Sequence, residues 1–321
     1  MHERRYNGRM SQHILRGRFR DAAAPWLFVG PWLLGLVTLV AFPFAASFVL
    51  SFCRYDMLSA PQYVGLHNYQ RLAQEIAAGE GFARALYQTA YYALLAVPLS
   101  IAVGIALAVM LSWNVRGRSI YRTVFFLPSV VPIVATSVLW IWLLDPNDGL
   151  VNWVLSWFGL PPQLWLKGHE EVLWTGRFGS KDALVLMSLW GVGNFMIIYL
   201  AAIGDVPRQL YEAAQLDGAG PVRRFRHVTL PLLTPVIFFN LVMGLIQSVQ
   251  AFTQIYIVSE GTGQPAGSLL VLSLFVFLSA FADLDMGYAS AVAWVLFVLL
   301  VVATAALFRW SRAWVHYQGM R

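Results

Sequence analysis

Long apolar stretches separated by short polar segments make up most of the sequence. A bilayer core about 30 Å thick is crossed by roughly 20 helical residues, which rise about 1.5 Å each. Six stretches reach this length without an Asp, Glu, Lys, Arg or His: 26–50, 85–113, 123–144, 183–204, 228–258 and 286–308. The pattern predicts an all-α membrane protein with six transmembrane helices, in a transmembrane domain over 26–310.

Basic residues are distributed unevenly between the polar segments. With the N-terminus placed in the cytoplasm, the cytoplasmic segments hold sixteen of the 22 Lys and Arg, six of them before residue 26. Lys and Arg are retained on the cytoplasmic side of a membrane. We therefore predict that the basic segment 1–25 and the tail 311–321 are both cytoplasmic.

A seventh uncharged stretch, 268–282, has only 15 residues. Counting it as a span would move Arg309, Arg312 and Arg321 to the outside, against the charge pattern. We expect instead a helix that lies in, or dips into, the outer interface.

Composition supports the membrane assignment and excludes other classes. The chain is 59% hydrophobic and 12% charged, with a mean hydropathy of +0.62, whereas soluble domains carry about 25% charge. A single cysteine, Cys53, excludes an internal disulfide. A net charge of +6 would suggest nucleic-acid binding in a soluble chain, but topology accounts for it here, and no nucleic-acid partner is expected.

The predicted outer segment 149–160 has the periodicity of an amphipathic helix. Apolar residues recur at helical spacing on one face: Leu150, Trp153, Val154, Trp157 and Phe158. Pro161 and Pro162 are expected to stop the helix. Two interpretations remain open, an interfacial helix anchored by tryptophan and a lid or docking surface for an external partner.

The sequence lacks the residues that several kinds of chemistry require. No span holds a histidine pair with metal-ligand spacing, so no metal site is expected. The sequence has no G-x-x-x-x-G-K-[ST] loop, so we do not expect this chain to hydrolyse ATP. Protons and sodium ions usually cross on Asp, Glu or His, which the spans lack. Neutral Ser188, Asn194, Gln247, Ser248 and Gln250 suit an uncharged polyhydroxy solute, or only hydrogen-bond neighbouring helices.

The longest predicted cytoplasmic loop, 205–231, contains a short helix. Pro207 is placed for a first turn, and Gly218 and Gly220 are expected to end the helix with left-handed backbone. A helix this short is marginal in water by itself. We therefore expect a partner to pack on it, on the face that carries Val206, Leu210, Ala213 and Ala214.

The same loop resembles the EAA loop of permease subunits in binding-protein-dependent ABC importers. The matching residues are Glu212-Ala213-Ala214, then Gly218, then Val228, Leu230 and Pro231, with Val228 where the family has Ile. Segments 125–128, 149–152 and 287–291 are similar to the carbohydrate branch of this family. Segment 260–265 departs from the usual Gly-Gly-Pro.

The resemblance implies a type I importer fold and a set of partners. Two cytoplasmic ATPase subunits would bind ATP and Mg²⁺, with no cofactor in this chain. A second, different permease would complete a heterodimer, and an extracytoplasmic solute-binding protein would deliver the solute. At the ATPase groove, Glu212 would meet charged residues or the helix start, Ala213 and Ala214 would permit close approach, and Gly218 would make the turn. Asp217 is a further residue of this coupling loop.

The resemblance further implies transport of a sugar-like solute across the cytoplasmic membrane of a prokaryote. A mono- or oligosaccharide, a polyol and glycerol phosphate all remain open, and the uncharged spans favour a neutral sugar. Solute contacts are predicted for Ser188, Asn194, Gln247, Ser248 and Gln250, with aromatic stacking from Phe252 or Trp190. An ion-coupled or passive transporter and a membrane scaffold are the alternative functions.

Overall fold

The computed structural model describes residues 28–113, 116–168 and 178–316. The predicted segment 1–25 and the last part of the predicted tail lie outside these residues. Four helices are long and apolar enough to cross a membrane: Phe28–Leu50, α4 (Phe82–Ser112), Pro221–Val249 and α16 (Met286–Ser311). The first contains η1 (Leu36–Ala41) and α2 (Phe42–Leu50), and the third contains α12 (Pro221–Arg224), η4 (Phe225–Thr229) and α13 (Leu230–Val249).

Two further spans are bent. Helix Arg118–Val130, made of α5 (Arg118–Phe126) and η2 (Leu127–Val130), meets α6 (Ile133–Leu143) at 99°. Helix α9 (Ser180–Trp190) meets α10 (Gly193–Gly204) at 46°. The structure thus contains four to six apolar spans, and six is reached if each bent pair crosses once. The count of six and the cytoplasmic termini stay predictions.

The predicted fifth span, 228–258, is wrong as one continuous helix. Helix α13 ends at Val249, and a separate short helix, α14 (Thr253–Val258), follows. Phe252 leaves helical geometry at φ −130°. The carbonyl of Ala251 at this break accepts a hydrogen bond from the Ser273 hydroxyl instead, so a side chain from outside the span stabilises the interruption.

The seventh apolar stretch forms a short helix, α15 (Leu272–Phe277) with η5 (Leu278–Ala282). It packs against α4 and α16, and Leu272 and Leu274 are buried. The Leu272 N–H donates to Thr89 Oγ1 of α4 at 2.8 Å. Both the side chains and the backbone of this stretch contact the bundle. These contacts favour the alternative in which the helix dips into the outer interface rather than lying along it.

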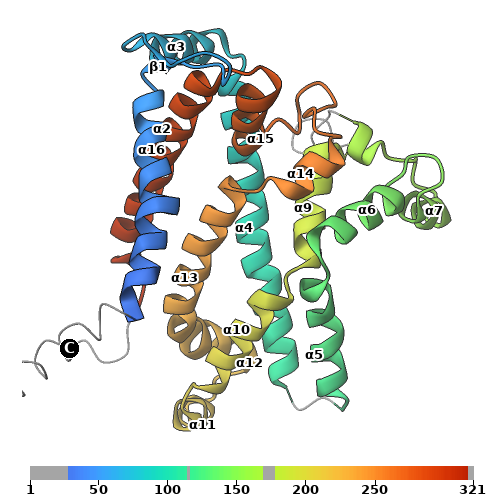
Figure 1. Cartoon of the computed structure of the whole chain (residues 1–321). Coiled ribbons are helices and arrows are strands. Elements are labelled where there is room, and N and C mark those ends of the chain that lie inside the picture. The colour runs from blue at the N-terminus through green and yellow to red at the C-terminus, as the bar shows by residue number, and fades with distance from the viewer. Residues whose placement is uncertain (1–27, 114–115, 169–177, 317–321) are drawn as a thin grey trace, which may run out of the picture.

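Helix α4 is the centre of the bundle. It packs against α10, α13 and α9, and against α15 and α3 at its first half (Figure 1). Two buried apolar clusters lie along it, one around Trp140, Leu184 and Ile255 and one around Met196 and Tyr199. These contacts hold both members of the bent pair α9 and α10 against one straight helix.

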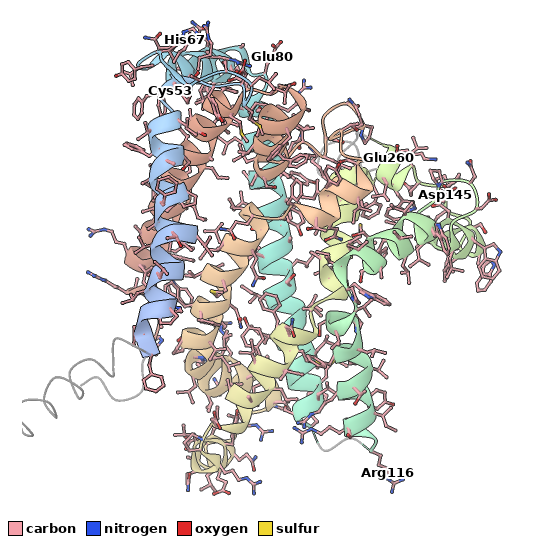
Figure 2. The ribbon with its side chains drawn as sticks, in the orientation of Figure 1. Cys53, His67, Glu80, Arg116, Asp145 and Glu260 are labelled. Atoms are coloured by element: carbon pink, nitrogen blue, oxygen red, sulfur yellow. The ribbon has the colours of Figure 1, made fainter. Side chains whose placement is uncertain are left out.

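A small cap closes the end of the bundle that the charge pattern predicts to be outside. Strand β1 (Cys53–Arg54) pairs antiparallel with β2 (Gln62–Tyr63), and α3 (His67–Ala78) follows. Figure 2 shows Cys53, His67 and Glu80 at this end and Arg116 at the opposite end. Arg116, which belongs to a segment that the charge pattern predicts to be cytoplasmic, and the cap therefore lie at opposite ends of the described molecule.

The predicted amphipathic segment forms α7 (Leu150–Trp157), and η3 (Trp165–Lys167) follows. The apolar face that the periodicity predicts for α7 is exposed, and the exposed fractions of Trp157 and Phe158 are 66% and 74%. The helix ends at Trp157, and Gly159, with a φ of +69°, turns the chain before the two prolines. Buried Asn152 fixes the opposite face by donating to the carbonyls of Pro146 and Gln163.

Candidate functional site

The predicted coupling segment contains the short helix that the sequence indicates. Helix α11 (Arg208–Leu216) begins directly after Pro207. Gly218 has a φ of +74°, and the Ala219 N–H reaches back to the Ala214 carbonyl at 2.8 Å, which is the hydrogen bond of a Schellman ending. Gly220 does not share this role: its φ of −68° is ordinary, and it precedes α12 instead.

One side of α11 rests on the bundle and the other is open. Val206 is buried just before the helix, and the Tyr211 hydroxyl hydrogen-bonds the Thr229 hydroxyl of η4 at 2.9 Å. Glu212, Ala213 and Asp217 are exposed, Ala214 is half-buried, and Leu216 is 91% exposed. The single face predicted for Val206, Leu210, Ala213 and Ala214 is thus divided between bundle and solvent.

The sequence did not reveal Tyr211 and Thr229 as positioning residues. They lie 18 residues apart, on different helices, so no local pattern joins them. The helix is consequently anchored at its centre by one side-chain hydrogen bond, and it presents Glu212, Ala213 and Leu216 away from the bundle.

The residues predicted to contact solute gather at two helix breaks. Ser188 and Trp190 lie in the last turn of α9, and Asn194 lies in the first turn of α10. Gln247 and Ser248 end α13, and Gln250 and Phe252 lie in the break before α14. In transporters, discontinuous helices commonly form solute sites near the bilayer midplane. The sequence predicted the residues but not these breaks.

Helix α6 connects the two breaks. Its Trp140 ring meets the Trp190 ring edge to face, with centroids 5.7 Å apart, and α6 also packs along α14. Phe252 contacts Tyr256 and Phe277 at centroid distances of 5.3 and 5.1 Å. The rings of the two predicted stacking residues are therefore both held by other aromatic rings. Trp190 contacts a ring of α6, and Phe252 contacts rings of α14 and α15.

The polar residues at the breaks divide into two groups. Ser188 and Ser248 donate to the carbonyls of Val185 and Leu245 in their own helices, as the alternative interpretation expects. Asn194, Gln247 and Gln250 are exposed. Buried Trp140 was not predicted, and its indole N–H has no hydrogen-bond acceptor among the described residues. The exposed amides are therefore open to a solute, whereas the Trp140 indole N–H is buried.

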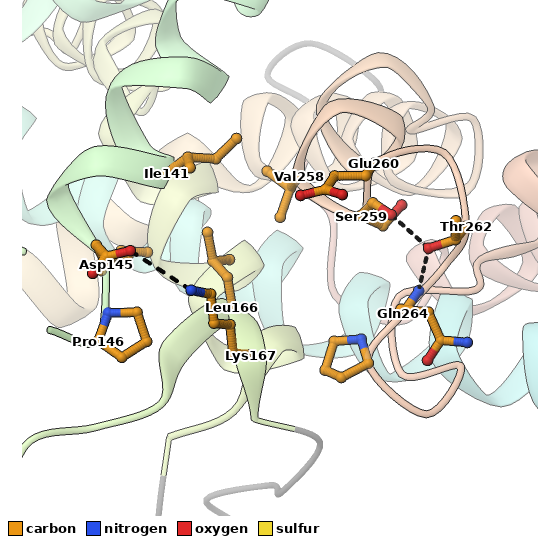
Figure 3. A pocket seen from close by; sticks show the side chains of 12 residues that line it. Ile141, Asp145, Pro146, Leu166, Lys167, Val258, Ser259, Glu260, Thr262 and Gln264 are labelled. Atoms are coloured by element: carbon orange, nitrogen blue, oxygen red, sulfur yellow. Dashed lines mark hydrogen bonds and ion pairs between the residues drawn. The ribbon is translucent and has the colours of Figure 1, made fainter.

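A cavity of about 360 Å³ lies beyond these breaks, at the far ends of α6 and α14 (Figure 3). It is lined by residues from the end of α6, from η3 and from the loop after α14. Lys167 Nζ lies 3.8 Å from Asp145 Oδ2. Hydrogen bonds from the backbone N–H groups of Asn147 and Asp148, with Lys167 nearby, hold the pKa of Asp145 below its ordinary value. No predicted solute residue lines this cavity.

Helix α9 begins earlier than its predicted span and brings charge into the bundle. Lys181 and Asp182 in its first turn are buried. The Tyr91 hydroxyl of α4 donates to Asp182 Oδ1 at 2.6 Å, and Lys181 Nζ lies 4.8 Å from the centre of the Tyr91 ring. The predicted span, which starts at Ala183, is uncharged, but the helix that contains it begins with these two charged residues.

A family model for binding-protein-dependent transport system inner membrane components matches residues 100–316. The chain belongs to this family. The permease is 38% identical over 98% of both chains to the probable ABC transporter permease protein YesP of Bacillus subtilis. It is 29% identical to the trehalose/maltose transport system permease protein MalF of Thermococcus litoralis, over 92% of this chain and 96% of that one.

A solved structure supports the same fold for this permease. It is a bacterial alginate ABC transporter in complex with a periplasmic protein that holds an alginate pentasaccharide. The TM-score is 0.75 at 25% identity, and the match covers 92% of this chain and 97% of that one. The permease therefore has the type I importer fold, and the predicted family is confirmed.

Proposed function

We propose that this permease is one of two different transmembrane subunits of an ATP-driven importer for a saccharide or sugar-like solute. It would act in the cytoplasmic membrane of a prokaryote. The similarity to a trehalose/maltose permease and to an alginate transporter supports the solute class. The apolar spans and the inner membrane family support the location.

The coupling segment is the observation that carries this proposal. Helix α11 has nine residues, too few to be stable in water without packing. It nevertheless exposes Leu216 at 91% beside Glu212 and Ala213. An apolar side chain with an adjacent carboxylate suits insertion into a groove of a second protein. Two ATPase subunits that bind ATP and Mg²⁺ are the partners that this role requires.

The solute path follows from the helix breaks. Alternating access needs elements that change relative orientation while their ends stay anchored. The breaks between α9 and α10 and between α13 and α14 lie in spans that pack on straight α4. Solute would pass Trp190, Asn194, Gln247, Gln250 and Phe252, with Ser188 and Ser248 beside them. A solute-binding protein would release it at the outer end.

A double variant tests the coupling role. Glu212→Lys with Gly218→Pro reverses the exposed charge and replaces the left-handed residue that ends α11. We expect ATP-driven uptake of labelled trehalose or maltose to fall to background in proteoliposomes that contain the complete importer. Membrane insertion and binding by the separate receptor should persist, because neither depends on this helix.

Charge reversal at the opposite end provides the control. Glu80 lies at the outer cap and is exposed, so Glu80→Lys should retain most uptake. Wild-type uptake by the double variant would remove the coupling assignment.

A further inference from the structure

The cavity between the end of α6, η3 and the loop after α14, here called the outer cavity, has the volume and the lining of a ligand site. Its volume of about 360 Å³ falls within the range of about 300–1,000 Å³ that is usual for small-molecule pockets. Leu144, Leu166 and Val258 form apolar walls, and Pro146 and Pro265 add flat, rigid surfaces. Apolar surfaces of this kind suit the C–H faces of sugar rings.

Polar groups reach the same cavity from both sides. Asp145 and Lys167 approach from the end of α6 and from η3, while Glu260 and Thr262 approach from the loop after α14 (Figure 3). Ser259 also lines the cavity, and its buried hydroxyl has no hydrogen-bond partner in the described part of the chain. This hydroxyl is buried behind the lining rather than open to the cavity, so the polar groups that the cavity offers are those of Asp145, Lys167, Glu260 and Thr262.

The backbone holds the second wall in an uncommon geometry. Glu260 has a φ of +52°, in the left-handed region that non-glycine residues rarely adopt. Thr262 Oγ1 donates to the Ser259 carbonyl at 2.7 Å and accepts from the Gln264 N–H at 3.3 Å. The loop is thereby fixed by its own hydrogen bonds, with Glu260 and Ser259 on the cavity.

The charges in the lining favour one kind of solute. Two carboxylates, Asp145 and Glu260, outnumber one ammonium group, Lys167. Carboxylates accept strong hydrogen bonds from hydroxyl groups. A phosphate or uronate would bring further negative charge next to them and would be disfavoured. The lining therefore selects a neutral molecule with many hydroxyl groups.

The position of the cavity connects it to the candidate solute path. Helix α6 begins at Ile133, after the 99° bend, and ends at Leu143, two residues before Asp145. Helix α14 begins at the break after α13 and ends at Val258, next to Ser259. The two helices pack together along their lengths. Their near ends thus border the helix breaks, and their far ends border the cavity.

We propose that this cavity is an outer binding site for a neutral saccharide, which it holds before the solute reaches the helix breaks. Asp145 and Glu260 accept hydroxyl hydrogen bonds, Lys167 and Thr262 complete the polar lining, and Pro146 and Pro265 contact the ring faces. The site deepens the proposed function and rests on it, because it assigns the solute class as neutral.

Protection of a single cysteine from labelling tests the site. Gln264→Cys, at an exposed lining position that contributes only its backbone N–H to the loop's hydrogen bonds, is introduced into a Cys53→Ser background, and the complete importer is labelled from the outside with a membrane-impermeant maleimide. Trehalose, maltose and lactose serve as neutral probes, and an alginate trisaccharide and glycerol 3-phosphate serve as anionic probes. We expect at least one neutral saccharide to slow labelling, and neither anion to do so. Ser59→Cys, exposed in the cap, is the matched control and should label at the same rate throughout.

A second variant identifies the carboxylate. Adding Glu260→Gln should raise the saccharide concentration for half-protection about tenfold, because a hydrogen bond to a charged acceptor is lost. The matched change Glu80→Gln, at an exposed cap carboxylate away from the cavity, should leave that concentration unchanged.

The outcomes separate this site from the importer function. ATP-driven uptake of a neutral saccharide without protection of Gln264→Cys would overturn the site alone. Protection without any ATP-driven uptake would retain the site and overturn the proposed function. Absence of protection by all three neutral saccharides, or protection by either anion, would overturn the proposal.

Discussion

The outer cap and the coupling segment are both short helical elements at the ends of the bundle, but they are built differently. In the cap, Asn68 donates to the carbonyls of Ser51 and Cys53, each at 2.9 Å. Arg71 pairs with Asp285 at 2.9 Å and with Glu75 at 3.3 Å. The coupling helix α11 has the Tyr211 and Thr229 hydrogen bond as the side-chain link that the structure describes.

This difference separates what the chain stabilises by itself from what it leaves to a partner. Helix α3 of the cap packs on α16 and α4, and its buried Asn68 amide is satisfied within the chain. The coupling helix leaves Leu216 at 91% exposure. Substitutions in the cap should therefore change the stability of the isolated permease, whereas substitutions on the open face of α11 should change assembly.

The largest effect is expected at Gly287, where α16 meets the cap. A Cβ at this position would overlap the Cys53 carbonyl, a backbone atom that cannot rotate away. Gly287→Ala should destabilise the detergent-solubilised permease by about 3 kcal/mol, measured by thermal unfolding. Gly35→Ala, whose added Cβ meets no atom within 4 Å, should not destabilise it. Equal stability of the two variants would show that the cap does not pack closely on α16.

Asn68→Ala should have the next largest effect. It leaves two carbonyl groups without their side-chain donor, which we expect to cost about 2 kcal/mol of unfolding free energy. Gln70→Ala, on the exposed side of the same helix, should stay within about 0.5 kcal/mol of wild type. A loss no larger than that of the control would remove Asn68 from the cap's support.

Tyr211→Phe addresses the anchor of the coupling helix. Loss of one hydrogen bond worth about 1 kcal/mol should speed hydrogen exchange of the α11 amides about fivefold. Global unfolding should change little, because α11 buries few side chains. Tyr121→Phe on α5, whose side chain is exposed, is the control. Unchanged exchange in Tyr211→Phe would mean that α11 is held by backbone contacts alone.

The smallest effect on stability is expected for Leu216→Ala. Its side chain is almost fully exposed, so the unfolding free energy should stay within about 0.5 kcal/mol of wild type. Affinity for the ATPase subunit should nevertheless fall about tenfold, as for an interface anchor. Leu58→Ala, at 85% exposure in the cap, should leave that affinity unchanged. Equal affinity of both variants would contradict the open-face assignment.

The sequence predicted the straight spans and the ends of α11, because both depend on local signals. Apolar length identifies a span without knowledge of its neighbours. Gly218 fixes the left-handed ending through its own backbone preference, while Pro207 precedes the helix as its N-cap, with a ψ of 128°, instead of lying in the predicted first turn. Gly220 was assigned wrongly because one left-handed residue already ends the helix.

The break after α13 depends on a contact that no local pattern contains. Pro235 lies inside α13 and does not interrupt it. The interruption occurs at 250–252, where the Ser273 hydroxyl of another helix donates a hydrogen bond to the Ala251 carbonyl. The bend after α9 did have a signal, since Gly191 and Gly193 flank Val192. Gly193 also lies against the backbone of Phe125, which leaves no room for a side chain.

ATP dependence of uptake tests the central claim most directly. Proteoliposomes would contain this permease with its partner permease, its ATPase subunits and the receptor, and labelled saccharide would be supplied outside with ATP inside. The proposed function predicts accumulation only when ATP and the ATPase subunits are both present. Accumulation by the permease alone, or accumulation driven by an ion gradient without ATP, would contradict it.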